Sequence, residues 1–186
     1  LLVASNSNDV LTRFFETGVM KKRKTIKTIS PSMDIQVSSN FERLMYDYLK
    51  KDTRLVNKYF FNLNTKDIFT IDKEKLEKML KLFQGFRLSD KETKECIKII
   101  YKDHNIVIDP HTAVGIEAGR KNRNDKELNV YLSTAHHGKF IDTVNNSLNE
   151  NIKLPKKLRD ILKKNEFYEV LDNNLLDLEK YIISKN

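Results

Sequence analysis

The fold is decided at the start of the chain, where residues 1–18 read LLVASNSNDVLTRFFETG. The apolar run of residues 1–4 predicts a buried strand, and either residue of the Asn-Asp pair that ends the following turn can cap a helix. Apolar side chains then recur at helical spacing, and Gly18 is a natural helix stop. A strand that leads directly into a helix is typical of an α/β fold, in which ligands bind at the carboxyl ends of strands. The polar turn of residues 5–8 is therefore a candidate wall of a binding site, although Asn and Ser are also ordinary turn and cap residues.

The composition leaves the number of domains and the class of partner open. A chain of 186 residues can bury one large core or two smaller ones. The 34 Lys and Arg against 26 Asp and Glu give a net charge of +8, which suits nucleic acid, an anionic membrane or phosphorylated small molecules. Only residues 21–27 form a dense basic run, and elsewhere Lys alternates with Glu and Asp as on a solvated surface. A basic helical module that binds nucleic acid therefore stays open as one alternative.

Several functional classes lack their sequence signals. Cys96 is the single cysteine, which excludes an internal disulfide and fits a reducing, cytoplasmic setting. No apolar run approaches membrane-spanning length, and the four His residues lack the spacing of a metal site. The five Gly residues form no phosphate-binding loop, and no Ser stands in a nucleophile elbow. The chain opens without Met in a strand-like run, so we expect a fragment of a larger protein.

The remaining chain predicts further helices and two short strands. Residues 51–91 are expected to be a helical elaboration rather than sheet, because apolar residues recur there at i, i+3, i+4 and i+7. Ser89 and Glu92 form a capping box pattern ahead of a helix that carries Cys96, and Asp109-Pro110 predicts the start of another. Predicted helices also cover residues 41–49, 140–148 and the tail from 155, and predicted strands cover 106–108 and 130–132.

Four blocks carry a resemblance to a known family. They read ASNSNDVLTRF at 4–14, SPSMDIQVSSNFERL at 30–44, DPHTAVG at 109–115 and LSTAH at 132–136. In these blocks, in their order and in their approximate spacing, the chain resembles the threonine synthases. The blocks span the first three-quarters of the chain.

The resemblance implies an architecture. The family shares the fold of the tryptophan synthase β subunit, in which two α/β domains enclose pyridoxal phosphate. The chain is then expected to be the C-terminal part of such an α/β fold. Residues 1–50 and 92–150 would belong to the α/β cofactor-binding domain, 51–91 would be a helical insertion, and 151–186 a helical tail.

The resemblance also implies a reaction. A pyridoxal-phosphate lyase of this family eliminates phosphate from O-phospho-L-homoserine and adds water to give L-threonine, a step of amino-acid biosynthesis. The family's cofactor-binding lysine and its phosphate loop lie upstream of these blocks, so no catalytic residue and no metal are expected here. The expected partners are the small-molecule substrate and the N-terminal part of the same polypeptide, in a cytoplasmic monomer or dimer that binds neither nucleic acid nor membrane. An inactive remnant of a threonine synthase is the second interpretation.

The blocks carry over six candidate site residues. Thr134 matches the family's hydroxyl residue at the pyridine nitrogen of the cofactor, and Ser133 is its neighbour; capping of the next helix is the rival role for Thr134. Four residues resemble those at the substrate's end of the cleft, with helix capping as the rival interpretation for the first three: Ser38, Ser39, Asn40 and Asn6. The chain departs from the family at His137-Gly138, where Pro and Ala are usual, and this puts the loop geometry and the activity in question.

Overall fold

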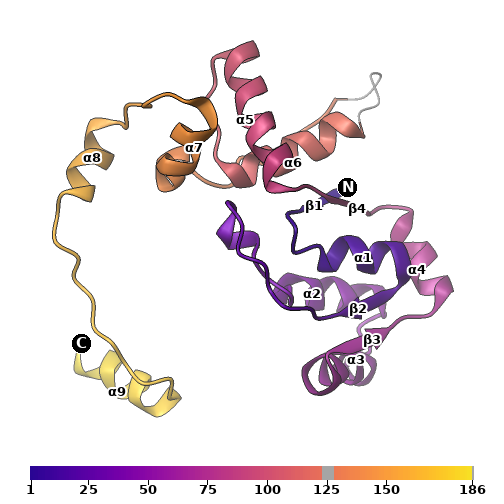
Figure 1. Cartoon of the computed structure of the whole chain (residues 1–186). Coiled ribbons are helices and arrows are strands. Elements are labelled where there is room, and N and C mark those ends of the chain that lie inside the picture. Colours follow the sequence, from indigo (N-terminus) through magenta and orange to yellow (C-terminus); the bar gives the residue numbers. More distant parts are fainter. Residues whose placement is uncertain (123–127, 186) are drawn as a thin grey trace. The chain divides into compact units, whose positions relative to one another are not determined.

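A computed structural model describes residues 1–122 and 128–185. The chain divides into two compact units, Leu1–Ile152 and Lys153–Asn186. The first unit holds the four strands and most of the helices, and the second holds two short helices (Figure 1). The candidate site residues all lie in the first unit.

The opening strand and helix form as the sequence predicts. Strand β1 (Leu2–Ser5) leads through a polar turn into α1 (Val10–Thr17), and Gly18 ends that helix in the left-handed conformation with φ 72°. The partner of β1 is the parallel strand β4 (Gln84–Arg87), which comes much later in the chain. Gly85 of β4 lies against α1 so closely that a Cβ atom there would stand 2.6 Å from Thr12 Cα. This glycine therefore lets the helix backbone pack directly on the sheet.

A second sheet and three helices surround α1. Strand β2 (Val19–Lys21) pairs antiparallel with β3 (Ile68–Thr70), and the helices are α2 (Ser39–Tyr48), α3 (Thr53–Lys66) and α4 (Lys73–Leu80). Their shared core centres on Phe14, whose ring meets Phe41 edge-on at 4.8 Å between centroids. Such aromatic pairs add directional attraction to burial.

The prediction of helix without sheet for residues 51–91 is wrong in part. Helices α3 and α4 confirm it, but β3 and β4 lie in the same segment and supply the partners of β2 and β1. Strands of three and four residues are too short to show an alternating pattern, and Gly85 weakens the strand signal further. The boundaries drawn at 50/51 and 91/92 remain a prediction.

The helices that follow form a second packed layer. The capping box of Ser89 and Glu92 is confirmed at the start of α5 (Asp90–His104), and Asp109 caps α6 (Pro110–Lys121). A short 3-10 turn, η2 (His137–Phe140), leads into α7 (Ile141–Leu148). The buried side chains between these helices include Cys96, Ile97, Ala113 and Val144.

The two short strands predicted at 106–108 and 130–132 are wrong. Neither segment forms a strand. Val130 and Leu132 leave 78% and 77% of their surface exposed. A β-branched run becomes a strand only where a neighbouring strand accepts its backbone hydrogen bonds. In the part of the chain that the structure describes, neither segment is paired in a sheet.

The predicted helical tail is confirmed as two separate helices. They are α8 (Lys156–Leu162) and α9 (Leu175–Ser184), and the apolar side chains of α9 are exposed within their own unit. Across the described residues, no helix has both the length and the apolar character that crossing a membrane would demand.

Candidate functional site

The turn after β1 is the centre of a buried polar network. Asn6 is 1% exposed, and its amide nitrogen lies 2.7 Å from Thr28 Oγ1, 2.9 Å from Ser30 Oγ and 2.8 Å from Asp34 Oδ1. The two amide hydrogens are shared among these acceptors. The side-chain oxygen Oδ1 of Asn6 accepts the backbone N–H of Asn8 at 2.8 Å. The turn thus fixes the loop between β2 and the 3-10 turn η1 (Pro31–Met33).

The sequence predicts that Asn8 or Asp9 caps α1, but neither side chain does so. Asn8 Oδ1 accepts the Ile26 N–H at 2.8 Å, and its amide nitrogen donates to the Ile26 carbonyl at 2.8 Å. Asp9 occupies the N-cap position without a capping hydrogen bond, because its carboxylate pairs with Arg13 at 2.8 Å. Both side chains therefore hold tertiary contacts that compete with capping.

The start of α6 carries a buried carboxylate. Asp109, 1% exposed, accepts the His111 N–H at 2.8 Å, the Thr112 N–H at 3.4 Å and the Thr112 hydroxyl. Burial by itself raises the pKa of Asp109, but the hydrogen bonds from His111 and Thr112 outweigh it and leave the pKa below its usual value. Asp109 is therefore held as a carboxylate.

His111 connects this helix start to η1. Its Nδ1 lies 2.9 Å from Asp109 Oδ1, and its Nε2 accepts the Ser32 N–H at 3.2 Å. The ring also packs on Phe140, with 4.6 Å between centroids. The sequence analysis missed this role, although a His two residues after an N-cap Asp is placed to reach that carboxylate. The signal is local but carries no periodic pattern.

Thr134 stands beside the same helix start. Its backbone N–H donates to Thr112 Oγ1 at 3.3 Å, while the residue itself and Ser133 are exposed. The loop that follows contains His137 and Gly138, where the chain differs from the family's usual Pro and Ala. His136 Nδ1 accepts the Gly138 N–H at 3.0 Å, and the rings of His136 and His137 lie tilted by 30° with 4.2 Å between their centroids. Burial and then the neighbouring His136 lower the pKa of His137, which favours a neutral ring at this position.

The other candidates lie at the start of α2. Ser38 occupies the N-cap position but makes no side-chain capping hydrogen bond, and Ser39 and Asn40 are exposed in the first turn. Asn6, by contrast, is enclosed in its network. The structure thus brings Thr134 to the start of α6 but does not gather the six predicted residues into one pocket.

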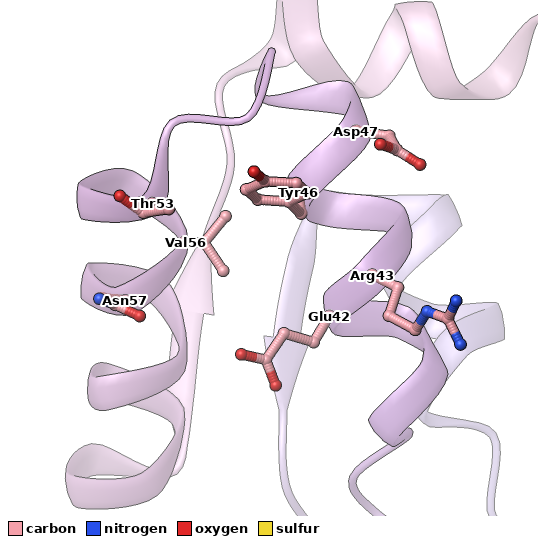
Figure 2. A pocket seen from close by; sticks show the side chains of 7 residues that line it. All are labelled: Glu42, Arg43, Tyr46, Asp47, Thr53, Val56 and Asn57. Carbon is pink, nitrogen blue, oxygen red and sulfur yellow. The ribbon is translucent and has the colours of Figure 1, made fainter.

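A hollow of about 520 Å³ lies between α2 and α3. Figure 2 shows Glu42 and Tyr46 reaching from α2 toward α3, whereas Arg43 and Asp47 point away. A second hollow of about 440 Å³ also has Glu42 in its lining and includes Ser39. Of the six predicted residues, Ser39 lines this second hollow and the others line neither. In the described ranges, 1–122 and 128–185, no group of three His, Cys, Asp or Glu residues is arranged to hold a metal ion.

Comparison with known proteins shows which proteins this chain resembles. Residues 112–183 match the family model described as "Threonine synthase, C-terminal". Threonine synthase of Saccharomyces cerevisiae is 40% identical over 95% of this chain and 40% of its own length, and that of Pseudomonas aeruginosa is 33% identical over 98% and 39%. The crystal structure of pyridoxal-phosphate-bound threonine synthase from Brucella melitensis superposes with a TM-score of 0.87 at 35% identity, over 98% of this chain and 39% of that one.

These matches cover almost all of this chain but about 40% of the relatives. They agree in sequence, in fold and in the family that they name. The family-model match begins at Thr112, in the first turn of α6, and includes Thr134. In sequence and in fold, nearly the whole chain therefore corresponds to part of a threonine synthase.

Proposed function

We propose that the protein is a pyridoxal-phosphate-dependent threonine synthase, which converts O-phospho-L-homoserine and water to L-threonine and phosphate. The observation that supports this most is the likeness to the Brucella melitensis enzyme, whose structure contains the cofactor and matches 98% of this chain. In this proposal the chain supplies one wall of the cofactor cleft. The lysine and the phosphate loop come from the N-terminal part of the same polypeptide.

Thr134 is our proposed contact to the pyridine nitrogen of the cofactor, with Ser133 second. The bound cofactor supplies an electron sink for the substrate's carbon atoms. A hydroxyl suits a ring nitrogen because it can donate to it without keeping it protonated, as a carboxylate would. The exposed side chain of Thr134 and its anchored backbone N–H support this role.

Ser38, Ser39 and Asn40 are our proposed substrate contacts. They are polar, lie in the first turn of a ten-residue helix, and present donors where an anionic phosphate is favoured. Asn6 is proposed with them from the family resemblance. Because its amide is held by Thr28, Ser30 and Asp34, contact with the substrate requires the network to open.

We further propose a cytoplasmic enzyme that acts as a monomer or dimer, binds no nucleic acid and does not associate with membranes. In the basic run, Lys22 pairs with Asp67 at 2.7 Å, so part of its charge is neutralised within the fold. A nucleic-acid-binding protein would show steeply salt-dependent association with DNA or RNA, and a threonine synthase would not.

The test uses the complete protein that contains this chain, loaded with pyridoxal phosphate. Absorbance of the bound cofactor and release of phosphate from O-phosphohomoserine are measured for the wild type, for Thr134→Ala and for the control Thr65→Ala, an exposed threonine of α3. We expect a cofactor band, turnover, and a fall in turnover of about 10- to 100-fold in Thr134→Ala alone, the value of one hydrogen bond in the site. A wild type without turnover would favour the inactive threonine-synthase-like protein, for which the His137-Gly138 departure is the motivating feature.

A further inference from the structure

The start of α6 joins segment 30–40, which Asn6 also holds through Ser30 and Asp34, to segment 133–138. Segment 30–40 contains one 3-10 turn before α2, and segment 133–138 has exposed side chains at Ser133 and Thr134. Both segments place a backbone N–H on the same cluster of side chains, which we call the α6 latch: Asp109, His111 and Thr112.

The hydrogen bonds of the latch have one consistent set of directions. Asp109 is an acceptor, so His111 Nδ1 carries the proton that faces it at 2.9 Å. His111 Nε2 then has a free lone pair, which accepts the Ser32 N–H at 3.2 Å. Thr112 donates its hydroxyl hydrogen to Asp109 and accepts the Thr134 N–H at 3.3 Å. This assignment of the histidine tautomer follows from the bonding pattern.

The centre of the latch is buried, whereas the hydrogen bond from Ser32 is exposed and the one from Thr134 is partly buried. The side chains of Asp109 and His111 are 0% and 7% exposed. A donor left facing a donor, or a carboxylate left without a partner, is penalised far more here than on the surface. One continuous chain of bonds therefore runs from Ser32 through His111, Asp109 and Thr112 to Thr134.

We propose that the α6 latch is a positioning device that fixes the substrate-side segment 30–40 and the cofactor-side loop 133–138 relative to each other. Its role in catalysis rests on the proposed function. None of the three latch residues is assigned a contact with substrate or cofactor. They act through Ser32, which precedes the proposed substrate contacts in the chain, and through Thr134, which is itself the proposed cofactor contact.

The histidine offers a matched pair of substitutions. In His111→Asn the side-chain amide nitrogen takes the place of Nδ1 and keeps the bond to Asp109, while the acceptor for Ser32 is lost. In His111→Gln the amide reaches the place of Nε2 and can keep the acceptor for Ser32. At the other end, Thr112→Val keeps the shape and removes the acceptor for Thr134. His104→Asn, an exposed histidine at the end of α5, is the control.

The first readout is amide hydrogen exchange in the complete protein, which requires no activity. We expect His111→Asn to speed exchange at Ser32 by about tenfold, the value of one hydrogen bond, with His111→Gln closer to wild type. Thr112→Val should act likewise at Thr134. His104→Asn should change neither amide. An unchanged Ser32 in His111→Asn, or equal acceleration throughout α6, would overturn the latch, since the second result indicates a purely structural residue.

The second readout, KM and cofactor affinity in the protein loaded with pyridoxal phosphate, distinguishes the Ser32 end of the latch from the Thr134 end. His111→Asn should raise KM for O-phosphohomoserine by about tenfold and leave cofactor affinity unchanged, while Thr112→Val should weaken cofactor binding by a similar factor. Asp109→Asn, which keeps a good N-cap, should affect both. If His111→Asn and Thr112→Val both changed only KM, or both changed only cofactor affinity, the latch would not connect the substrate side with the cofactor side. A wild type with no cofactor band refutes the proposed function instead, and hydrogen exchange still decides the latch.

Discussion

The core around Phe14 and the segment 128–134 use similar apolar residues to opposite effect. Phe14 is fully buried and meets aromatic rings from α1, α2 and β3. In segment 128–134, Leu128, Val130 and Leu132 expose 92%, 78% and 77% of their surface. Tyr131 of the same segment instead lies over Gly119 of α6, where a Cβ would collide with its ring.

The difference shows that an apolar pattern specifies structure only where partners are in place. Residues around Phe14 find their partners within the first 90 residues, so the predicted helices form and pack. The strand pattern of 130–132 finds no pairing strand in the described part of the chain, and no strand forms there.

The largest expected effect is the loss of the Phe14 ring. Phe14→Ala should lower the free energy of unfolding by about 3–5 kcal/mol, because it leaves a cavity among rings that cannot close around it. Leu132→Ala should change it by less than about 0.5 kcal/mol in the chain of residues 1–186. Urea unfolding of both variants makes the measurement. Equal losses would show that the two regions are packed alike.

The second-largest expected effect concerns the buried polar turn at Asn6, and it shows how much this network contributes to the free energy of unfolding. Asn6→Ala leaves the oxygens of Thr28, Ser30 and Asp34 without their shared donor, and we expect a loss of about 2–3 kcal/mol. The exposed Asn40→Ala is the control, with a change below about 0.5 kcal/mol. If thermal or urea unfolding detected no difference between the two, the network would not contribute to stability.

Two glycines differ in the space that is available for a side chain, which gives a further comparison. Gly85→Ala forces a Cβ to within 2.6 Å of Thr12 Cα and should cost about 1–3 kcal/mol. Gly115 lies in the interior of α6, and a Cβ added there would meet nothing within 4 Å, so Gly115→Ala should stabilise by about 0.5–1 kcal/mol. Opposite signs in urea unfolding are the expected result, and two losses would contradict it.

The smallest effect lies on the surface. Lys121 and then Ser89 hold the pKa of Glu92 at about 2, against an ordinary value of 4.5. A lowered folded-state pKa means that the carboxylate stabilises the fold above pH 4.5 and loses this contribution as the pH falls toward 2. Glu92→Gln should therefore cost at most about 1 kcal/mol at pH 7, because the pair is partly exposed, and less at pH 3. A difference that does not shrink at pH 3 would argue against the ion pair.

Local signals were enough to predict the helices and the first strand. Gly18 ends α1, Ser89 and Glu92 cap α5, and Asp109 with Pro110 begins α6, each through contacts within a few residues. Strands β2, β3 and β4 were not predictable in this way, because each is three or four residues long and depends on a distant partner.

The candidate site shows the same division. Family blocks placed Thr134 and the start of α2, but their geometry depends on His111, which joins Ser32 to Asp109 across the fold. An isolated His in a first helical turn has no spacing that reveals such a bridge. The failed capping prediction at Asp9 has a similar cause, since Arg13 and Arg87 engage its carboxylate from one turn later and from a neighbouring strand.

The parallel pairing of β1 with β4 also limits when the sheet can form during translation. Leu2 pairs with Gln84, so the first strand leaves the ribosome long before its partner exists. At about 5–20 residues per second, the roughly 80 intervening residues take on the order of 4–16 s to translate. During that interval the apolar edge of β1 is available to chaperones or to other nascent chains. Strand β1 can therefore pair only after β4 has been made.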